Sequence, residues 1–492
     1  MDVWVRSGWS RGRSDPVPRG VRPQTTDISN HIRGYQRSKM DRAWVNKFLT
    51  FTFVAILPTL MAHIVDLDEV WQKRAEEAWN NSLAACEPNS ETVVNTFNEH
   101  GHTANINSTR RHLRKKYRGP CMAYNPIECW RCRKNWANNR KRLANCVQGF
   151  GHKAIGGKKG RIYVVTDPSD NYVVNPRPGT LRHAVIQKGP LWIIFARSMT
   201  IRLSQELIMQ SDTTIDARGA NVNIARGAGI TIQFVRNIII HNLHFNDIVS
   251  TNGALSDSVD HVGIRQKSDG DSISTFQSSD IWIDHISMSR SADGLIDIVE
   301  GSTGITISNC HFADHDKVLL FGAEDKNPKD RIMQVTVAYK PLCWCKELPR
   351  CRWGFFHLVN NDCTHRLMYA IGGCNGVTII SQGNSSLPHS TQKQRRCLDS
   401  FQKQALTATL IGGWYVQQVT HRNNAVESEW KSWLWRSEGD LMMNGAFFVQ
   451  SGNPNGARAF PNLKLIRPQP GTEVTRLTKF TGSLGCRVTK AC

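Results

Sequence analysis

Four short runs rich in β-branched residues constrain the fold of this chain more than any other feature, because the runs align with one another. They begin at Ile238, Ile281, Ile305 and Val335, so successive starts lie 43, 24 and 30 residues apart. Units of roughly 20–30 residues are typical of a solenoid, in which each strand stacks on the equivalent strand of the next coil. A propeller or a sandwich also has many short strands, but tight Asn-Gly or Asp-Gly hairpins do not join most of these runs. We therefore expect an all-β chain folded as a parallel β-helix.

Asn242 and Asn309 occupy the same place in their runs. Amides stacked at a bend can hydrogen-bond to one another along the axis of a solenoid. We interpret both residues as members of a structural amide ladder rather than as ligands. Asp284 and His285 lie in another of the runs, and for them we also expect a hydrogen-bonded structural role.

Carboxylates and a lysine gather in the stretch that crosses two of these repeats: Asp269, Asp271, Asp293, Asp297 and Lys317. The acids converge only if the backbone returns to the same place in each coil, as it does in a solenoid. Calcium takes several oxygen ligands, preferably carboxylates. An EF-hand loop is excluded, because Ile273 and Ser274 stand where it needs an oxygen ligand and a glycine. Taken alone, the last two aspartates also fit the end of a coil, where carboxylates cap turns.

The chain of 492 residues carries a formal charge of +21. Its first 62 residues hold ten Lys/Arg and four Asp/Glu, so the remainder keeps +15. A charge of this sign favours polyanionic partners, whether nucleic acid, an anionic membrane or an acidic polysaccharide. No interleaved aromatic platform accompanies the basic residues, so we do not expect a nucleic-acid partner.

An apolar run at residues 48–60 follows basic residues and precedes a small one, as in a secretory signal. We expect residues 40–62 to be the signal peptide and residues 1–39 to be an extra leader. The alternative for the apolar run is a buried hydrophobic helix. A signal peptide implies a secreted protein with no membrane segment after its removal, and we expect a monomer.

The fourteen cysteines of an exported chain indicate disulfide bonds. Cys121, Cys129, Cys132 and Cys146 cluster ahead of the repeats, and no second Cys pair or His pair follows at metal spacing. Disulfides are therefore a better interpretation than a zinc site. Three sequons are compatible with a glycoprotein: Asn80, Asn107 and Asn384.

The rest of the chain divides by its patterning. Residues 63–115 are polar, and their segment Asp68–Trp79 has a helical pattern that places four residues near one face: Val70, Trp71, Ala75 and Trp79. We expect the β-helix to occupy residues 116–465. Residues 466–492 are then a C-terminal tail.

A series of motifs follows in order along the chain: GTLRHAVIQ (179–187), PLWIIF (190–195), ELIM (206–209), TID (214–216), GAGITIQ (227–233), SDGDSIS (268–274), IWIDH (281–285), ADGLID (292–297), GSTGITISN (301–309), PRCRWGFFHLVNND (349–362), YAIGG (369–373) and WRSEGDLMMNGAFF (435–448). No single motif is specific, but the ordered series resembles the plant pectate lyases of polysaccharide lyase family 1. The resemblance covers roughly residues 120–450.

This resemblance implies a right-handed parallel β-helix that cleaves polygalacturonate, the de-esterified pectin of the cell wall, by calcium-dependent β-elimination. The positions that resemble the family's calcium ligands are Asp269, Asp271, Asp293 and Asp297. Lys317 resembles its substrate-carboxylate lysine, and Arg352 resembles its substrate-binding arginine. The acidic substrate agrees with the basic charge of the chain.

The segment 340–348 departs from the family pattern, in which the arginine of an RMP motif removes the proton. When Pro349-Arg-Cys-Arg352 is used as the anchor, Glu347 stands at that arginine's position. A glutamate repels the substrate carboxylates that an arginine attracts, so we expect impaired catalysis. Residues 385–408 also resemble nothing in the family, and replacement of whole segments between matching flanks is typical of a shifted reading frame.

Three functions follow from these observations. The first is a calcium-dependent pectate lyase whose catalytic position holds Glu347. The second is a homologue that binds calcium and pectate without cleaving the polymer. The third, less favoured, is a β-helical polygalacturonase, which needs paired acids but no calcium.

Overall fold

The structure is a computed structural model, and it describes residues 69–87, 121–253, 255–257, 262–264, 267–340, 342–347, 349–366, 369–388, 417–423, 425–453 and 466–492. For residues 255–257, 262–264, 342–347, 365–366 and 388 it describes the backbone alone. The expected leader at 1–39 and signal peptide at 40–62 lie outside these ranges. Residues 62–492 form one compact unit, to which the following description applies.

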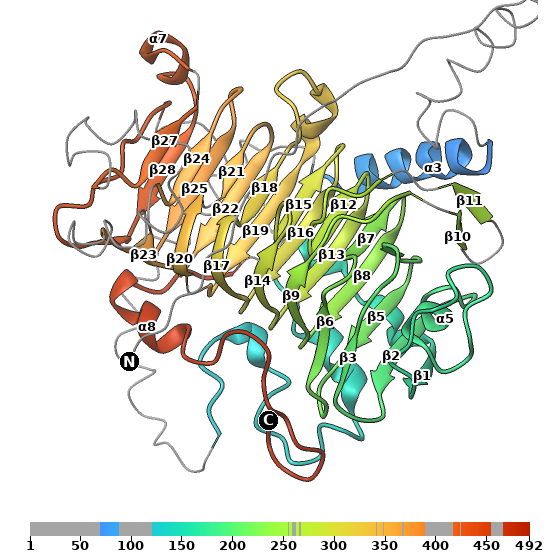
Figure 1. Cartoon of the computed structure of the whole chain (residues 1–492). Helices are drawn as coiled ribbons and strands as arrows, with labels where there is room; N and C mark the ends of the chain where they lie inside the picture. Colours follow the sequence, from blue (N-terminus) through green and yellow to red (C-terminus); the bar gives the residue numbers. More distant parts are fainter. Residues whose placement is uncertain are drawn as a thin grey trace, which may run out of the picture. The chain divides into compact units, whose positions relative to one another are not determined.

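Three parallel sheets build this unit, and the chain visits them in turn in each coil (Figure 1). Sheet A contains, in spatial order, β1 (Arg161–Val165), β2 (Leu191–Phe195), β5 (Thr213–Asp216), β8 (Arg236–His241), β13 (Ser279–Asp284), β16 (Thr303–Ser308), β19 (Gln334–Ala338), β22 (Phe355–Val359), β25 (Thr378–Gln382) and β28 (Trp435–Glu438). Sheet B contains β3 (Met199–Ile201), β6 (Val222–Ala225), β9 (His244–Ile248), β14 (Ser287–Ser291), β17 (His311–Lys317) and β20 (Leu342–Glu347). Sheet C contains β4 (Leu207–Ile208), β7 (Ile230–Gln233), β12 (Ile273–Phe276), β15 (Ile296–Val299), β18 (Leu319–Phe321), β21 (Arg350–Cys351), β24 (Ile371–Gly373) and β27 (Thr420–Arg422).

Two smaller sheets complete the strands. The first is the antiparallel pair β10 (Leu255–Asp257) and β11 (Val262–Ile264). The second contains β23 (Asp362–Arg366), β26 (Ser385–Pro388) and β29 (Leu441–Met442). Helical segments are short except for the first: α3 (Glu69–Ala85), η2 (Pro126–Glu128), η3 (Arg140–Asn145), η4 (Phe150–Lys153), η5 (Gly156–Lys159), α5 (Leu181–Val185), η6 (Pro328–Ile332), α7 (Glu427–Trp430), η7 (Gly471–Glu473) and α8 (Val474–Leu477). The predicted parallel β-helix is confirmed.

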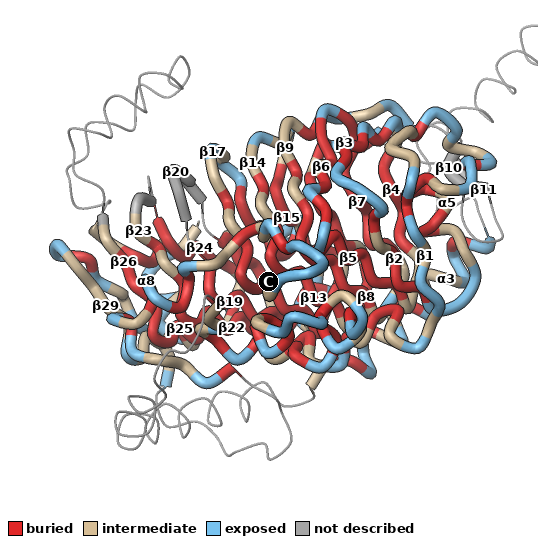
Figure 2. The backbone as a smooth tube through the Cα atoms, turned by 90° about the horizontal axis from the view of Figure 1, so that it is seen from below, coloured by how far each residue is buried: buried red, intermediate tan, exposed pale blue. Residues whose placement is uncertain are grey.

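The register of sheet A matches the alignment of the four runs. Ile281 pairs with Ile238 on one side and with Ile305 on the other, and Ile305 pairs with Val335. These side chains are buried and belong to one core that extends along the coils, which Figure 2 shows as continuous buried strands. Because successive residues of a strand point to opposite faces, a one-residue slip would move this whole row out of the core to the other face of the sheet.

The predicted amide ladder through Asn242 and Asn309 is wrong. Both residues have positive φ, 66° and 50°, at the bend between sheets A and B, but His285 occupies the same bend in the coil between them. Asn242 Nδ2 donates to Leu484 O at 3.1 Å, and Asn309 Oδ1 accepts from Asn125 Nδ2 at 2.8 Å. The bend amides therefore hold the two terminal segments of the unit rather than each other.

An amide contact between coils occurs one position further along. Asn361 Nδ2 donates to Asn384 Oδ1 at 3.0 Å, and the Asn384 amide also donates to Leu358 O at 2.9 Å. Asn384 is buried. Its sequon is therefore not accessible for glycosylation in the folded chain, whereas Asn80 lies exposed on α3.

The outer face of sheet A is covered by residues 121–160, which we call the N-terminal cap. Phe150 N and Gly151 N donate to Thr336 Oγ1 at 3.1 Å and Thr306 Oγ1 at 2.9 Å, two threonines that pair across β16 and β19. The approach is close: a Cβ on Gly157 would lie 1.8 Å from Leu191 O. Beyond β1, sheet A is thus largely buried on both faces, which accounts for its nearly continuous apolar strands.

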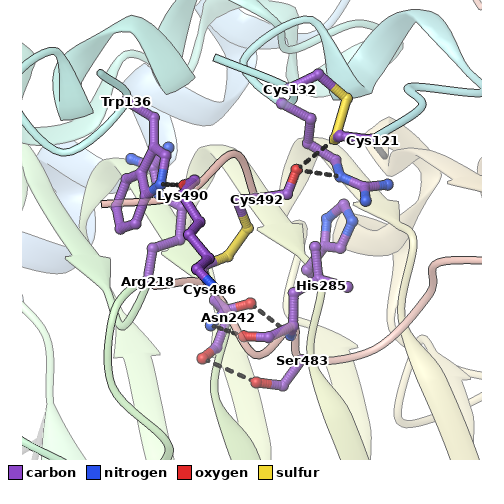
Figure 3. Close-up of a disulfide and its surroundings, with 12 residues drawn as sticks. Cys121, Cys132, Trp136, Arg218, Asn242, His285, Ser483, Cys486, Lys490 and Cys492 are labelled. Carbon is purple, nitrogen blue, oxygen red and sulfur yellow. Dashed lines mark hydrogen bonds between the residues drawn. A yellow bond between two sulfur atoms is a disulfide. The ribbon is translucent and has the colours of Figure 1, made fainter. Parts of the chain in front are cut away.

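Two disulfides, Cys121–Cys132 and Cys129–Cys146, brace the N-terminal cap and confirm the disulfide interpretation of this cluster. A third, Cys486–Cys492, closes the end of the C-terminal tail. Figure 3 shows how the tail reaches the cap: Trp136 Nε1 donates to Lys490 O at 2.9 Å, and Cys132 N donates to Cys492 O at 3.3 Å. The two terminal segments therefore close over sheet A together.

Helix α3 confirms the predicted N-terminal helical segment and is longer than expected. Its buried face differs from the predicted one: Trp71, Ala78, Ser82 and Ala85 are buried, whereas Val70 is 40% exposed. Trp71 packs with Ile208 and Phe234. The buried face of the helix thus contains Trp71 and the residues seven and eleven positions after it, Ala78 and Ser82. No helix in the described ranges is both long and apolar enough to cross a membrane.

His285 and Asp284 are buried beneath the cap, as expected for a structural pair. His285 Nδ1 and His241 Nδ1 lie 2.7 and 3.0 Å from the same oxygen, Asp284 Oδ2. His285 Nε2 faces Glu128 of the cap at 3.7 Å. Burial alone would lower the pKa of His285, but the charge and hydrogen bond of Asp284, with a contribution from Glu128, raise it to about 9. A buried imidazolium therefore links the cap to the coils.

We predict that this imidazolium makes the protein less stable at alkaline pH. The unfolded pKa is about 6.5, so the contribution is fully present below that pH and is lost as the pH rises through 9. It amounts to roughly 3–4 kcal/mol, because each pKa unit is worth about 1.4 kcal/mol. Thermal unfolding followed by circular dichroism should show the melting temperature falling between pH 7 and 10 less steeply in His285→Gln than in the unaltered chain.

The matched control is His357→Gln. This second buried histidine has its pKa lowered to about 3 by burial, so it is neutral throughout the alkaline range. Its substitution should change the melting temperature without changing the alkaline slope. Equal slopes in His285→Gln and the unaltered chain would contradict the assignment of a buried imidazolium.

Candidate active site

The predicted site residues lie where the chain passes from sheet B to sheet C. Asp271 precedes β12, Asp293 lies between β14 and β15, and Asp297 is the second residue of β15. Lys317 ends β17 one coil further on. Because the coils stack in parallel register, residues at the same turn in successive coils lie above one another. The repeat therefore assembles the site.

Three of the four predicted metal ligands form one group. Oxygen atoms of Asp271, Asp293 and Asp297 all lie within 4.8 Å of one another. Asp269 is exposed and lies outside this group, two residues before Asp271. Its negative charge nevertheless contributes to raising the pKa of both Asp271 and Asp297. The structure thus brings three acids together and places the fourth beside them.

The acids enclose a space that fits a cation. Asp297 Oδ1 is buried and has no hydrogen-bond partner among the described residues. A Cβ on Gly294 would lie 2.1 Å from this oxygen and 3.0 Å from Asp271 Oδ1. Gly294 N also donates to Asp271 Oδ1 at 2.6 Å. Clustered carboxylate oxygens in an open cradle are the donor set that calcium prefers, so the residues present fit this ion.

Gly294 is a candidate site residue that the sequence alone did not single out. Its only sequence signal is its position between two candidate ligands, Asp293 and Asp297. Any side chain at this position would enter the space between the carboxylates.

Crowding makes these acids hard to ionise without a cation. Burial is the main cause that raises the pKa of Asp271 to about 7, and Asp269 and Asp293 raise it further, against the hydrogen bond from Gly294. Burial and the neighbouring carboxylates also raise the pKa of Asp297 well above its usual value. A divalent cation removes this cost, because it stabilises the ionised forms.

Lys317 lies beside the group as predicted. Its Nζ donates to Asp293 Oδ1, and the lysine side chain is 64% exposed. His315, which the sequence reasoning did not single out, has Nε2 2.5 Å from Asp293 O and so fixes the backbone between sheets B and C. The ammonium group can therefore reach solvent and the acids from the same position.

The next coil carries the remaining predicted residues. The backbone of Glu347 pairs with that of Lys317 in β20 and β17, so Glu347 lies one coil beyond the lysine at the same edge. The side chain of Glu347 lies outside the described part of the chain. Arg350 is in register with Leu320, which is in register with Asp297. The Arg350 Nε is buried without a hydrogen-bond partner among the described residues.

The structure does not bring Arg352 into the acid group. Arg352 is 9% exposed, its Nε donates to Asp325 Oδ1 at 2.9 Å, and its Nη1 donates to Gly322 O. These contacts hold the guanidinium against the loop that follows β18. A role in substrate binding requires the substrate to reach this loop or the side chain to turn.

Comparisons with known proteins show the family of the chain. A family model described as "Pectate lyase" matches residues 200–408, and one described as "Pectate lyase, N terminus" matches residues 63–113. A probable pectate lyase P59 of Solanum lycopersicum is 54% identical over 461 residues, which span 90% of this chain and 98% of the relative. A pectate lyase of Lilium longiflorum is 50% identical over 446 residues, which span 89% and 97%.

A solved structure extends the agreement to the fold. The crystal structure of Jun a 1, the major allergen from cedar pollen, aligns with a TM-score of 0.65 and 36% identity, and covers 73% of this chain and 99% of that one. The identity to the plant relatives extends over nearly the whole chain. The chain belongs to the pectate lyase family.

Proposed function

We propose that this pectate lyase cleaves polygalacturonate by calcium-dependent β-elimination at the edge between sheets B and C. The observation that carries the proposal is the open cradle at Gly294, where carboxylates converge around an unpartnered Asp297 oxygen. The ligands are Asp271, Asp293 and Asp297, with Asp269 completing the set from the exposed side. Such a site leaves positions for the uronate carboxylates of the substrate.

The chain supplies binding and orientation at this edge. Lys317 is exposed and points its ammonium to the acid group, where it neutralises a substrate carboxylate. Arg352 binds a further uronate once its guanidinium is released from Asp325. When bound, calcium draws charge from the C6 carboxylate of the sugar and so acidifies the C5 proton.

Proton removal is the step that this chain performs poorly. In this proposal Glu347 takes the position of the family's arginine, and its backbone lies one coil beyond Lys317. A carboxylate at this position adds negative charge next to a polyanionic substrate, which weakens binding where a guanidinium strengthens it. Loss of a positioned base commonly costs about 10²–10⁴ in rate. The same residue favours a second candidate function, a homologue that binds calcium and pectate without cleaving the polymer.

The place of action is the cell wall, outside the cell. Residues 40–62 serve as the signal peptide in this proposal, and the basic charge of the remaining chain suits an acidic wall polymer. The cap cysteines are paired, as in proteins that fold in an oxidising compartment.

We predict that calcium stabilises the protein more at pH 8 than at pH 5. The folded pKa of Asp271 is about 7, above its usual 3.8, so without calcium its contribution to stability is fully present below pH 4 and is lost as the pH rises through 7. Calcium binds the ionised acids and reverses this loss. The difference in melting temperature between calcium and chelator should therefore grow from pH 5 to pH 8.

Asp297→Asn tests the same site by calorimetric titration with calcium. The substitution removes one ligand charge and should weaken calcium binding about tenfold or more. Asp314→Asn is the matched control, because Asp314 is an exposed carboxylate on β17 outside the acid group. Equal calcium affinities in the two variants would contradict the assignment of the calcium site.

A separate prediction concerns the altered catalytic position. Glu347→Arg should raise the formation of ultraviolet-absorbing unsaturated products by roughly 10²-fold, because it restores a guanidinium base. Glu347→Gln is the control, since it removes the negative charge without supplying a base, and chelator should abolish activity in every variant.

The outcomes separate the two candidate functions. If Glu347→Arg gains no more than Glu347→Gln, the position is not that of the base. If the unaltered chain already forms unsaturated products as fast as an active arginine variant does, the binding-only function is excluded.

A further inference from the structure

The N-terminal cap presents almost only positive charge to solvent. Residues 121–160 contain nine Lys/Arg and a single acidic residue, Glu128. Glu128 is buried and is committed to Arg131 at 2.6 Å. Four basic side chains of the cap are exposed without an ion pair to the described part of the chain: Arg133, Lys134, Arg142 and Lys159. Acidic side chains of the cap therefore do not balance the positive charge on its surface.

A cleft of about 610 Å³ opens in this surface. Its walls carry three cations and three amides: Arg133, Lys141, Arg142, Asn135, Asn138 and Asn139. No carboxylate lines it. Apart from the apolar residues Ala137 and Ile162, the lining thus offers hydrogen-bond donors and positive charge.

The cations of the cleft divide into fixed and free groups. Arg140, at its base, is buried, with Nη1 2.8 Å from Arg218 O and 3.3 Å from Asp216 Oδ2. Its guanidinium also stacks on Trp136, 4.8 Å from the ring centre. Lys141 Nζ donates to Gly160 O. The free cations are Arg133 and Arg142, whose guanidinium groups can each bind a carboxylate through paired hydrogen bonds.

The cleft lies away from the candidate active site. The cap covers the outer face of sheet A, through contacts such as Gly151 N to Thr306 Oγ1. The acid group lies at the edge between sheets B and C. A polymer strand held in the cleft therefore does not occupy the calcium cradle.

We propose that this cap cleft is a second, non-catalytic binding surface for polygalacturonate. The polymer presents a carboxylate and hydroxyl groups on every sugar, which match the guanidinium and amide groups of the lining. A nucleic acid fits less well, because none of the described residues that line the cleft is aromatic, so the cleft offers no stacking platform. Attachment at a second surface raises the local concentration of the active site on a long substrate.

The inference rests on pectate being the substrate of this chain, and its test does not need catalysis. Binding to immobilised polygalacturonate is measured in chelator, so that the calcium site cannot contribute. Arg133→Glu/Arg142→Glu should weaken this binding about tenfold or more, because it replaces two carboxylate-binding groups with repelling charges. The matched control is Arg197→Glu/Arg236→Glu, which changes the net charge equally at exposed positions outside the cleft.

Three results would overturn the proposal. In the first, both double variants lose binding equally, so that only net charge matters. In the second, the cleft variant binds as tightly as the unaltered chain. In the third, a DNA oligonucleotide of equal charge binds the cleft more tightly than polygalacturonate does.

Cleavage supplies an independent arm in the Glu347→Arg background. The cleft variant should lose rate on long polygalacturonate while retaining its rate on a galacturonate trimer, which is too short to span both surfaces. Failure of the proposed lyase mechanism would abolish both rates and leave the binding difference in chelator intact, so the two failures are distinguishable. An unchanged ratio of polymer rate to trimer rate would contradict a tethering role.

Discussion

The in-register stacking of parallel coils is the constraint on which the rest of the structure depends. One buried row contains Ile238, Ile281, Ile305 and Val335. Its register fixes the position of each of these coils along the axis of the β-helix, and with it the position of the other residues in the coil. Neighbouring parallel strands lie about 4.8 Å apart, so side chains at one turn of successive coils are brought within contact distance. Residues more than twenty positions apart in sequence, such as Asp271 and Gly294, therefore hydrogen-bond directly.

The same stacking forces like charges together at the candidate site. Asp271 and Asp297 are held where burial and neighbouring carboxylates raise their pKa, which disfavours their ionised forms. A structure evolved only for stability gains nothing from such an arrangement. The glycine between them leaves space that a cation can use. The unfavourable ionisation of these acids and the space between them together indicate a cation-binding role, which neither feature indicates alone.

The outer face of sheet A shows how the terminal segments complete the fold. The cap and the tail bind to threonine hydroxyls, to asparagines at the bends and to a buried imidazolium. The cap and the tail also contact each other at Trp136 and Lys490. The Trp136–Lys490 contact joins segments 354 residues apart in sequence. The cap also displays exposed cations that have no ion pair with the described residues, so one element closes the core and provides the basic cleft.

The sequence by itself determined the parallel β-helix, the register of its apolar runs and the disulfide cluster, and it proposed the candidate acids, because a stacked repeat leaves a period in the residues. Only the tertiary structure decided which acids share one group, that Gly294 opens the cradle between them, and that Asn242 and Asn309 hold the tail and the cap instead of each other. It also turned Arg352 toward Asp325 and buried Asn384. These outcomes depend on which face of a bend each side chain takes and on what packs against it from distant segments, and a repeat period carries no information about either.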